Sequence, residues 1–217
     1  MKNAWKFLGG CGCLSMLVGT VMLAAFFVTN RGSMPSLTGN DLAHYENTRE
    51  GRTGNLAENY VDFSFDYPPT WRLNTTDPDN INFVTVERQA DGKTWENLNV
   101  GYFRPAPSEA ENQNLYRQVL GQIEGQFSQQ FKDFRKISDG PTKVSSYDAY
   151  EALYAGWVEA DGKRIDVYTR AIFLPTPDGT KGVSFMMMGT SANPDLEKPE
   201  DLGKEGELPL VLGSFRF

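Results

Sequence analysis

Three Asp-Gly pairs, each between two runs of alternating apolar and polar residues, constrain the fold of this 217-residue chain more than any other feature. They are Asp91-Gly92, Asp161-Gly162 and Asp178-Gly179. Such a pair is typical of a tight hairpin, because both residues tolerate the positive φ that the turn requires. Since hairpins join antiparallel neighbours, the sequence predicts a mostly antiparallel sheet.

The predicted strands form two groups along the chain. They alternate apolar and polar side chains, as a half-buried strand does. The first group comprises residues 61–67, 71–74, 81–88 and 95–103, and the second comprises 150–158, 164–174 and 183–190.

A long helix is predicted between the two groups. Ser108 and Glu111 have the spacing of a capping box, which marks a helix start. Apolar residues then recur every three or four positions, as on one buried helix face. They are Leu115, Val119, Ile123, Phe127, Phe131 and Phe134. We expect Asp139-Gly140-Pro141 to end this helix and residues 208–212 to form a second, short one, which gives an α+β fold.

A transmembrane segment is predicted near the start of the chain. It begins at Phe7 and ends at Val28, and it contains no charged residue, Pro, Asn or Gln. As a helix these 22 residues cover roughly 33 Å, enough to cross a hydrocarbon core of about 30 Å. We therefore expect residues 7–28 to be a signal-anchor helix that makes the membrane itself a partner of the chain.

The charges beside this segment predict its orientation. Lys2 and Lys6 precede it, and only Arg31 follows before acidic residues begin. Positive residues favour the cytoplasmic side. We expect a single-pass protein of the cytoplasmic (inner) membrane, with residues 1–6 inside and residues 29–217 in the periplasm or outside the cell.

Two other interpretations of the segment compete with an uncleaved anchor. A cleavable signal peptide needs small residues at −3 and −1, but a cut after Ala25 puts Leu23 at −3, and a cut after Ala24 puts Met22 there. A lipoprotein signal has its apolar run before the modified Cys, whereas here the run follows Cys11. Both patterns fit less well than an uncleaved anchor.

Residues 29–59 have the composition of a linker. They are rich in Gly, Ser, Thr, Asn and charged residues and show no sustained apolar period. We expect a flexible coil with a root-mean-square reach of roughly 30 Å, within which residues 40–50 can form a short helix. His44, the only His of the chain, lies there and is interpreted as a solvated bystander. The folded domain is expected over residues 60–217.

The net charge favours a protein partner. The chain carries −7, which becomes −9 once the cytoplasmic Lys2 and Lys6 are left out. Nucleic-acid binding needs a basic face, so a nucleic-acid partner is not expected. The same charge repels an anionic bilayer surface. The outer domain is therefore expected to bind a protein rather than lipid headgroups.

No catalytic, cofactor or metal site is expected. A Ser, Cys or Thr nucleophile needs a base, and the exported part offers only His44. Both Cys residues, Cys11 and Cys13, lie within the predicted anchor, which leaves little material for a zinc site. Residues 77–82 are similar to a calcium loop, but Ile81 stands where the third oxygen ligand belongs.

The three consecutive Met residues, Met186, Met187 and Met188, are a candidate cluster of soft metal ligands. In a strand, successive side chains point to opposite faces of the sheet. They are therefore interpreted as core residues.

Two short motifs resemble a known family. Residues 63–71 read Phe-Ser-Phe-Asp-Tyr-Pro-Pro-Thr-Trp, and residues 212–217 read Leu-Gly-Ser-Phe-Arg-Phe. They are similar to the opening and closing motifs of PsbP-like domains, a superfamily shared by an extrinsic photosystem II protein, a Ran-binding nuclear import factor and bacterial exported proteins. The resemblance covers residues 60–217. It implies an α/β/α sandwich with a central, mostly antiparallel sheet, used as a non-catalytic module.

These observations predict a membrane-anchored, extracytoplasmic binding or assembly module that is not an enzyme. Two alternatives stay open. One is a carboxylate-based hydrolase of the envelope, whose acids come together from separate loops. The other is a photosystem-type accessory protein.

Overall fold

The computed structural model describes residues 42–77, 79, 81–90, 93–160 and 162–217. The predicted anchor, residues 7–28, and the segments predicted on either side of it up to residue 41 lie outside the described residues. Within the described ranges, no helix is both long and apolar enough to span a membrane.

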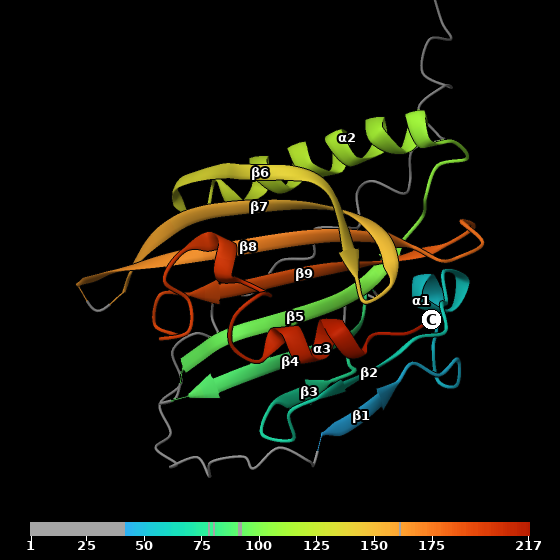
Figure 1. Cartoon of the computed structure of the whole chain (residues 1–217), viewed down its shortest axis with the longest axis horizontal. Coiled ribbons are helices and arrows are strands. Elements are labelled where there is room, and N and C mark those ends of the chain that lie inside the picture. The colour runs from blue at the N-terminus through green and yellow to red at the C-terminus, as the bar shows by residue number, and fades with distance from the viewer. Residues whose placement is uncertain (1–41, 78, 80, 91–92, 161) are drawn as a thin grey trace, which may run out of the picture.

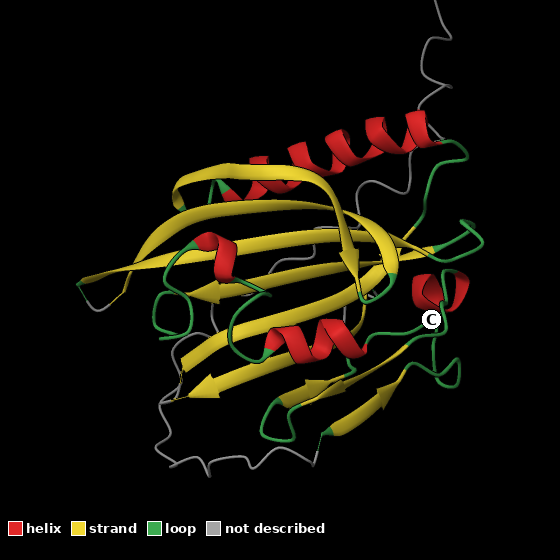
Figure 2. Cartoon of the chain, in the orientation of Figure 1, coloured by secondary structure: helices red, strands yellow, loops and turns green. Residues whose placement is uncertain are grey.

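A seven-stranded antiparallel sheet forms the centre of the domain (Figure 1, Figure 2). Its strands lie in the order β3-β4-β5-β9-β8-β7-β6. Their bounds are β3 Arg72–Asn74, β4 Asn82–Ala90, β5 Lys93–Phe103, β6 Lys132–Val144, β7 Tyr147–Ala160, β8 Lys163–Pro175 and β9 Gly182–Thr190. Every pair of neighbours in this order is antiparallel, as the sequence predicted.

The strands flanking the three Asp-Gly pairs are hairpin partners. Ala90 pairs with Lys93, and Ala160 pairs with Lys163, so two of the connections are two residues long. Gly162 has a φ of +70°, and Gly179 in the longer third connection has a φ of +68°. These values are the ones that favour Gly in tight turns, and the predicted hairpins are confirmed.

The two faces of the sheet contact different layers. In β9, Met187 belongs to the core on one face, whereas Met188 belongs to the core on the other face, and Met186 packs beside it. The three Met side chains therefore do not converge, and their interpretation as core residues is confirmed.

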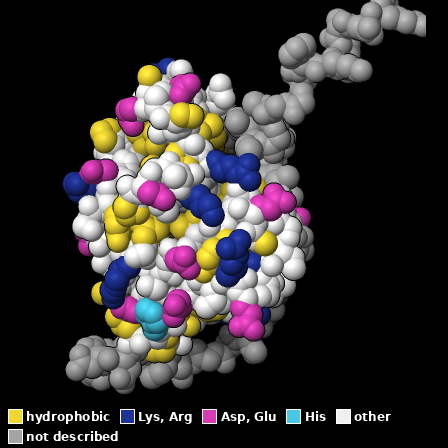
Figure 3. Space-filling model, turned by 90° about the vertical axis from the view of Figure 1, so that its right-hand side faces the viewer, with side chains coloured by type: hydrophobic (Ala, Val, Ile, Leu, Met, Phe, Trp, Pro, Cys, Tyr) yellow, Lys and Arg dark blue, Asp and Glu magenta, His cyan; other side chains and the backbone are white. Residues whose placement is uncertain are grey.

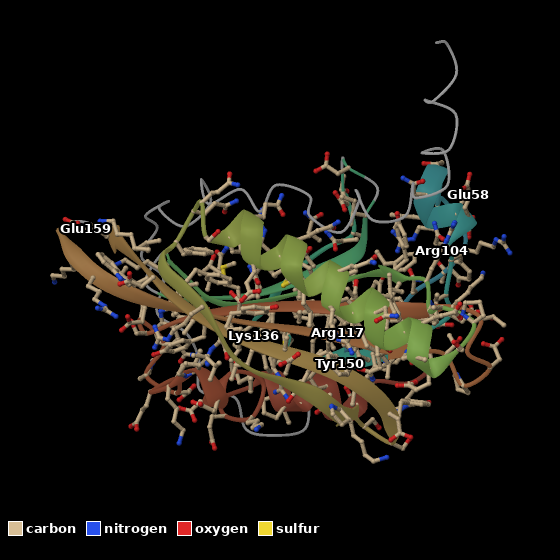
Figure 4. All side chains as sticks on the ribbon, turned by 90° about the horizontal axis from the view of Figure 1, so that it is seen from above. Glu58, Arg104, Arg117, Lys136, Tyr150 and Glu159 are labelled. Carbon is tan, nitrogen blue, oxygen red and sulfur yellow. The ribbon has the colours of Figure 1, made fainter. Side chains whose placement is uncertain are left out.

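Helix α2 (Glu109–Phe127) covers one face of the sheet (Figure 4). Its start is the predicted one, because Ser108 accepts a hydrogen bond from the backbone N–H of Glu111 and donates one to the carboxylate of Glu111. The apolar residues that it buries are Tyr116, Val119, Leu120, Ile123 and Phe127.

The predicted end of this helix is wrong. The helix stops at Phe127, Phe131 follows in a reversal of the chain, and Phe134 already lies in β6. Asp133 has a φ of +51° and lies within a register shift, between Lys132 and Arg135, in the pairing of β6 with β7. The three Phe rings lie 5.5 to 5.8 Å apart, so the reversal keeps them on the same core and mimics a helical period.

The Asp139-Gly140-Pro141 sequence lies inside β6 instead of ending a helix. Strand β6 is the last strand of the sheet order. Pro141 has no N–H to donate, and an edge strand tolerates this because only one side of it is paired.

The opposite face of the sheet is covered by several short elements. They are helix α3 (Leu208–Ser214), a segment of residues 191–207 that contains the 3₁₀ helix η2 (Pro199–Asp201), helix α1 (Gly54–Glu58), and a two-stranded sheet of β1 (Ala43–Glu46) and β2 (Ser64–Tyr67). Leu208 and Val211 bury the apolar side of α3, which confirms the predicted second helix. The domain thus has a helix-containing layer on each side of an antiparallel sheet.

The expected linker over residues 29–59 is too long, and the folded domain begins before residue 60. Strand β1 pairs with β2, so that Tyr45 lies opposite Phe65 and both rings are buried. The helix expected over residues 40–50 is also wrong. Tyr45 points into the core while His44 and Glu46 are exposed, which is the period of a strand.

Candidate functional site

A polar cavity of about 320 Å³ lies beside β1 and β2, on the face shown in Figure 3. Three of its lining residues are titratable: His44, Glu46 and Asp62. The others are Asn47, Phe63, Ser64 and Phe217. We call this cavity the β1–β2 pocket.

Strand alternation places the titratable side chains. His44 and Glu46 leave β1 on its exposed side, opposite Tyr45. Asp62 stands just before β2 and is exposed, while its neighbours Val61 and Phe63 are buried. The short strand pair therefore turns its acidic side chains toward solvent at one edge of the pocket.

His44 is held in place by a carboxylate. Its Nδ1 lies 2.7 Å from Oδ1 of Asp66, and an Nη of Arg216 lies 3.6 Å from the other oxygen of that carboxylate. In Figure 3 the histidine, in cyan, lies beside acidic side chains in magenta. Asp66 is therefore shared between two basic side chains, unlike the acids of the pocket.

Glu46 and Asp62 have no basic partner among the described residues. Asp62 accepts a hydrogen bond of 2.6 Å from the hydroxyl of Tyr60, and burial raises the pKa of this Tyr to about 12. Asn47 is buried, donates to the carbonyl of Val61 and makes one wall rigid. The pocket therefore presents two carboxylates whose charge is not compensated by an ion pair.

A second polar cluster lies near the hairpin that joins β4 and β5. Arg88 of β4 contacts three carboxylates: Glu96 at 3.3 Å, Asp195 at 2.8 Å and Glu207 at 3.1 Å. These residues come from β5, from the 191–207 segment and from the residue before α3. The guanidinium also lies 5.1 Å from the ring centroid of Trp95. We call these four charged residues the Arg88 cluster.

Glu96 is the buried member of this cluster. Its side chain has no exposed surface, and its Oε1 has no hydrogen-bond partner among the described residues. Burial raises its pKa to about 7, although Arg88 opposes the shift. Carboxylates from separate elements thus do meet in this domain, but Arg88 engages all three of them.

In the calcium-like sequence, Asp77 binds backbone groups of the same stretch. The carboxylate of Asp77 accepts backbone N–H groups of Asp79, Ile81 and Asn82 at 2.6 to 3.0 Å. Its oxygens are engaged in stabilising the connection between β3 and β4. Across the described part of the chain, no group of three His, Cys, Asp or Glu side chains is arranged to hold a metal.

Sequence reasoning missed both polar clusters. His44 was assigned to a linker because β1 has only four residues, too few for a clear period. Arg88 and Asp195 are 107 positions apart, so no local pattern relates them. The pairing of β1 with β2 and the folding of residues 191–207 onto the sheet bring these residues together.

Comparison with known proteins identifies the fold. A scan against protein-family models and a search of curated proteins gave no match. Among solved structures, the chain is similar to cyanobacterial PsbP (CyanoP) from Synechocystis sp. PCC 6803, with 16% identity and a TM-score of 0.53. The match covers 85% of this chain and 97% of that one. The domain has a PsbP-like fold.

Two further solved structures are similar over most of their length. LpqN, described as involved in cell envelope biogenesis of Mycobacterium tuberculosis, has 11% identity and a TM-score of 0.45, covering 81% of this chain and 91% of its own. The Saccharomyces cerevisiae Ran-binding protein Mog1p has 10% identity and a TM-score of 0.41, covering 81% and 96%.

The two motifs that resemble PsbP-like domains, residues 63–71 and 212–217, meet at the β1–β2 pocket. Ser64 forms an isolated antiparallel bridge with Arg216. The rings of Phe63 and Phe215 stack with centroids 5.5 Å apart. Phe63, Ser64 and Phe217 all line the pocket, so the motif residues that mark the fold also build its wall.

Proposed function

We propose that this chain is a membrane-anchored, non-catalytic binding or assembly module, and that the β1–β2 pocket binds a basic side chain of a protein partner. The observation that carries the proposal is the pair of uncompensated carboxylates, Glu46 and Asp62, on the wall of a preformed pocket. A Lys or Arg side chain supplies the donors and the positive charge that this wall lacks.

The size and charge of the pocket fit this ligand chemistry. A volume of about 320 Å³ lies at the lower end of the range for small-ligand sites. Hydrogen bonds to a charged group contribute about 1.5–3 kcal/mol each. The negative charge of the outer part also accelerates encounter with a basic partner, an effect that salt weakens.

In this proposal residues 7–28 anchor the domain in the cytoplasmic membrane, with residues 1–6 inside. The apolar length of the segment and the position of the Lys residues support it. Only residues 29–41 separate the anchor from the folded domain, and 13 residues span at most about 45 Å. A partner of the pocket is therefore a membrane protein or a protein held near the membrane.

The carboxylate-hydrolase alternative has one observation in its favour, the gathering of three acids around Arg88. A hydrolase needs its carboxylates on an open cleft that admits the substrate. Glu96 has no exposed surface, which favours binding over catalysis. The photosystem-type alternative rests on likeness to cyanobacterial PsbP, and that likeness concerns the fold.

Photo-crosslinking in native membranes tests the proposal. A photoreactive residue replaces Ser64 in the full chain, because Ser64 lines the pocket without supplying its charge. We expect a crosslink to one protein, through a Lys- or Arg-containing peptide of it. Replacing both Glu46 and Asp62 by Lys should abolish the crosslink.

The matched control replaces Glu159 and Glu205 by Lys, which changes the net charge equally. Both are exposed, and Glu159 lies at the opposite end of the domain from Glu58 and α1 (Figure 4). This variant should keep the crosslink. Equal loss in both variants would show a general charge effect, and a crosslink that survives both would show that the pocket does not bind a basic group.

A further inference from the structure

The segment of residues 191–207 covers one end of the sheet, in front of β8 and β9 (Figure 1). Leu196 and Leu202 attach it by apolar contact, and both side chains are almost fully buried. They pack on the backbone of Gly189, where an added Cβ would lie 2.5 Å from Leu196 and 2.9 Å from Leu202. The segment is thus a cover over apolar surface.

Polar contacts hold the same cover. Arg170 donates a hydrogen bond of 3.0 Å to the carbonyl of Leu202. Arg88 binds Asp195 near the start of the segment and Glu207 at its end. Arg88 therefore ties both ends of the segment to β4, and the charge balance around it affects closure.

Glu96 lies beneath this cover. Three charged groups face its carboxyl from the surrounding elements: Arg88 from β4, Asp195 from the segment and Glu207 from its end. The unpartnered Oε1 lies 3.5 Å from the position that a Cβ of Gly206 would take. Gly206 itself is exposed, so the cover over Glu96 is thin at this point.

We propose that Glu96 is a proton-controlled latch, whose protonated form holds the 191–207 segment closed and whose ionised form releases it. With Glu96 ionised, one guanidinium faces three carboxylates, and Oε1 is a buried charged acceptor without a donor. Burying such a group is unfavourable unless water or a donor reaches it. Water reaches Oε1 when Asp195 and Gly206 move outward.

Within this proposal, Glu96 ionises near neutral pH. Burial raises the pKa of Glu96 from 4.5 to about 7. An open segment hydrates the carboxyl and returns its pKa toward the ordinary value, so rising pH favours opening. Opening uncovers the apolar surface beneath Leu196 and Leu202.

Hydrogen–deuterium exchange of the full chain in detergent tests the latch. Amides of residues 193–207 are compared at pH 5 and pH 8, after correction for the intrinsic exchange rate. We expect protection to fall on the order of 100-fold at pH 8 in the wild type. Glu96→Gln carries no ionisable carboxyl and should keep the same protection at both pH values.

The matched control is Glu205→Gln, the same chemical change at an exposed position of the segment. It should behave as the wild type. A pH-independent wild type, or a Glu96→Gln variant that keeps the pH dependence, would overturn the proposal. Should Glu96→Gln not fold, carbon NMR of the wild-type Glu96 carboxyl decides: a midpoint near 7 supports the latch, and one near 4.5 refutes it.

Discussion

The indole N–H of Trp71 donates a hydrogen bond of 2.8 Å to Oε2 of Glu207, although the two residues are 136 positions apart in the sequence. The same oxygen lies 3.1 Å from Nε of Arg88. Trp71 ends the first of the two motifs that resemble PsbP-like domains, and Glu207 immediately precedes α3. This contact therefore connects the first part of the fold to the Arg88 cluster and to the final helix.

Replacing Trp71 by Phe should lower the free energy of unfolding by about 2–4 kcal/mol. The change leaves a cavity at a buried position and removes a hydrogen bond to a charged group. Urea denaturation measures it. Trp157→Phe is the control, because Trp157 also donates to a carboxylate at 2.8 Å but is half-exposed, and its cost should be about 1 kcal/mol or less. Equal costs would contradict the assigned role of burial.

Replacing Arg88 by Met should destabilise the domain by about 3–5 kcal/mol at neutral pH. The variant leaves the buried Glu96 and two further carboxylates without their shared cation. Lys143→Met is the control, since Lys143 pairs with Asp148 and both side chains are exposed. Its effect on the free energy of unfolding, measured by urea denaturation, should be within about 1 kcal/mol. A small effect of Arg88→Met would show that the cluster does not hold the final helix.

Two Gly-to-Ala substitutions should shift stability in opposite directions. At Gly189 the new Cβ collides with Leu196 and Leu202, so Gly189→Ala should cost about 1–3 kcal/mol. At Gly121 in α2 the new Cβ meets no described atom within 4 Å other than its chain neighbours and the backbone of its own helix, so Gly121→Ala should stabilise by about 0.5–1 kcal/mol. Thermal unfolding of both variants checks the pair. Stabilisation by Gly189→Ala would show that residues 191–207 do not pack on β9.

The stability of the domain should fall between pH 4.5 and pH 7. The pKa of Glu96 is about 7 in the folded state and near 4.5 when the carboxyl is hydrated. A raised folded-state pKa means that the folded state binds the proton more tightly. The contribution of this proton to the free energy of unfolding is therefore complete below pH 4.5. It is lost as pH rises through 7, which lowers the free energy of unfolding by roughly 2–3 kcal/mol.

Urea denaturation across this pH range measures the slope. Glu96→Gln should reduce it, whereas Glu205→Gln should leave it unchanged because Glu205 is exposed. A wild-type stability that rises steadily from pH 4.5 to 7 would contradict the assignment of the proton to Glu96.

Local sequence was sufficient for the elements whose signals lie within a few residues. Asp-Gly turns predicted which strands pair as hairpins, because the turn itself brings the two strands together. Ser108 and Glu111 predicted the start of α2, since both ends of the capping interaction lie within one turn. The antiparallel hairpins β4–β5, β7–β8 and β8–β9 followed from these signals, whereas strand β6, the pairing of β5 with β9 and the separate sheet of β1 and β2 did not.

Local sequence predicted the wrong secondary structure where residues of a turn or strand happen to have the spacing of a helix, or where a strand is too short to show its own period. Phe127, Phe131 and Phe134 have helical spacing, yet Phe134 lies in β6 and its ring stacks on Tyr154 at 5.2 Å. In the same way, residues 43–46 are too short a run to show that Tyr45 is buried against β2. Burial depends on the partner strand, which local composition does not specify.

By itself the sequence determined the α+β class, the antiparallel hairpins, the resemblance to PsbP-like domains and the acidic net charge. Only the tertiary structure decided which acids line the β1–β2 pocket, Glu46 and Asp62, and which acid is buried, Glu96. The physical reason is the sequence separation of the residues that make each contact. Hairpins and caps are contacts between near neighbours, whereas a pocket wall or a shared guanidinium needs side chains that only packing brings within hydrogen-bond distance.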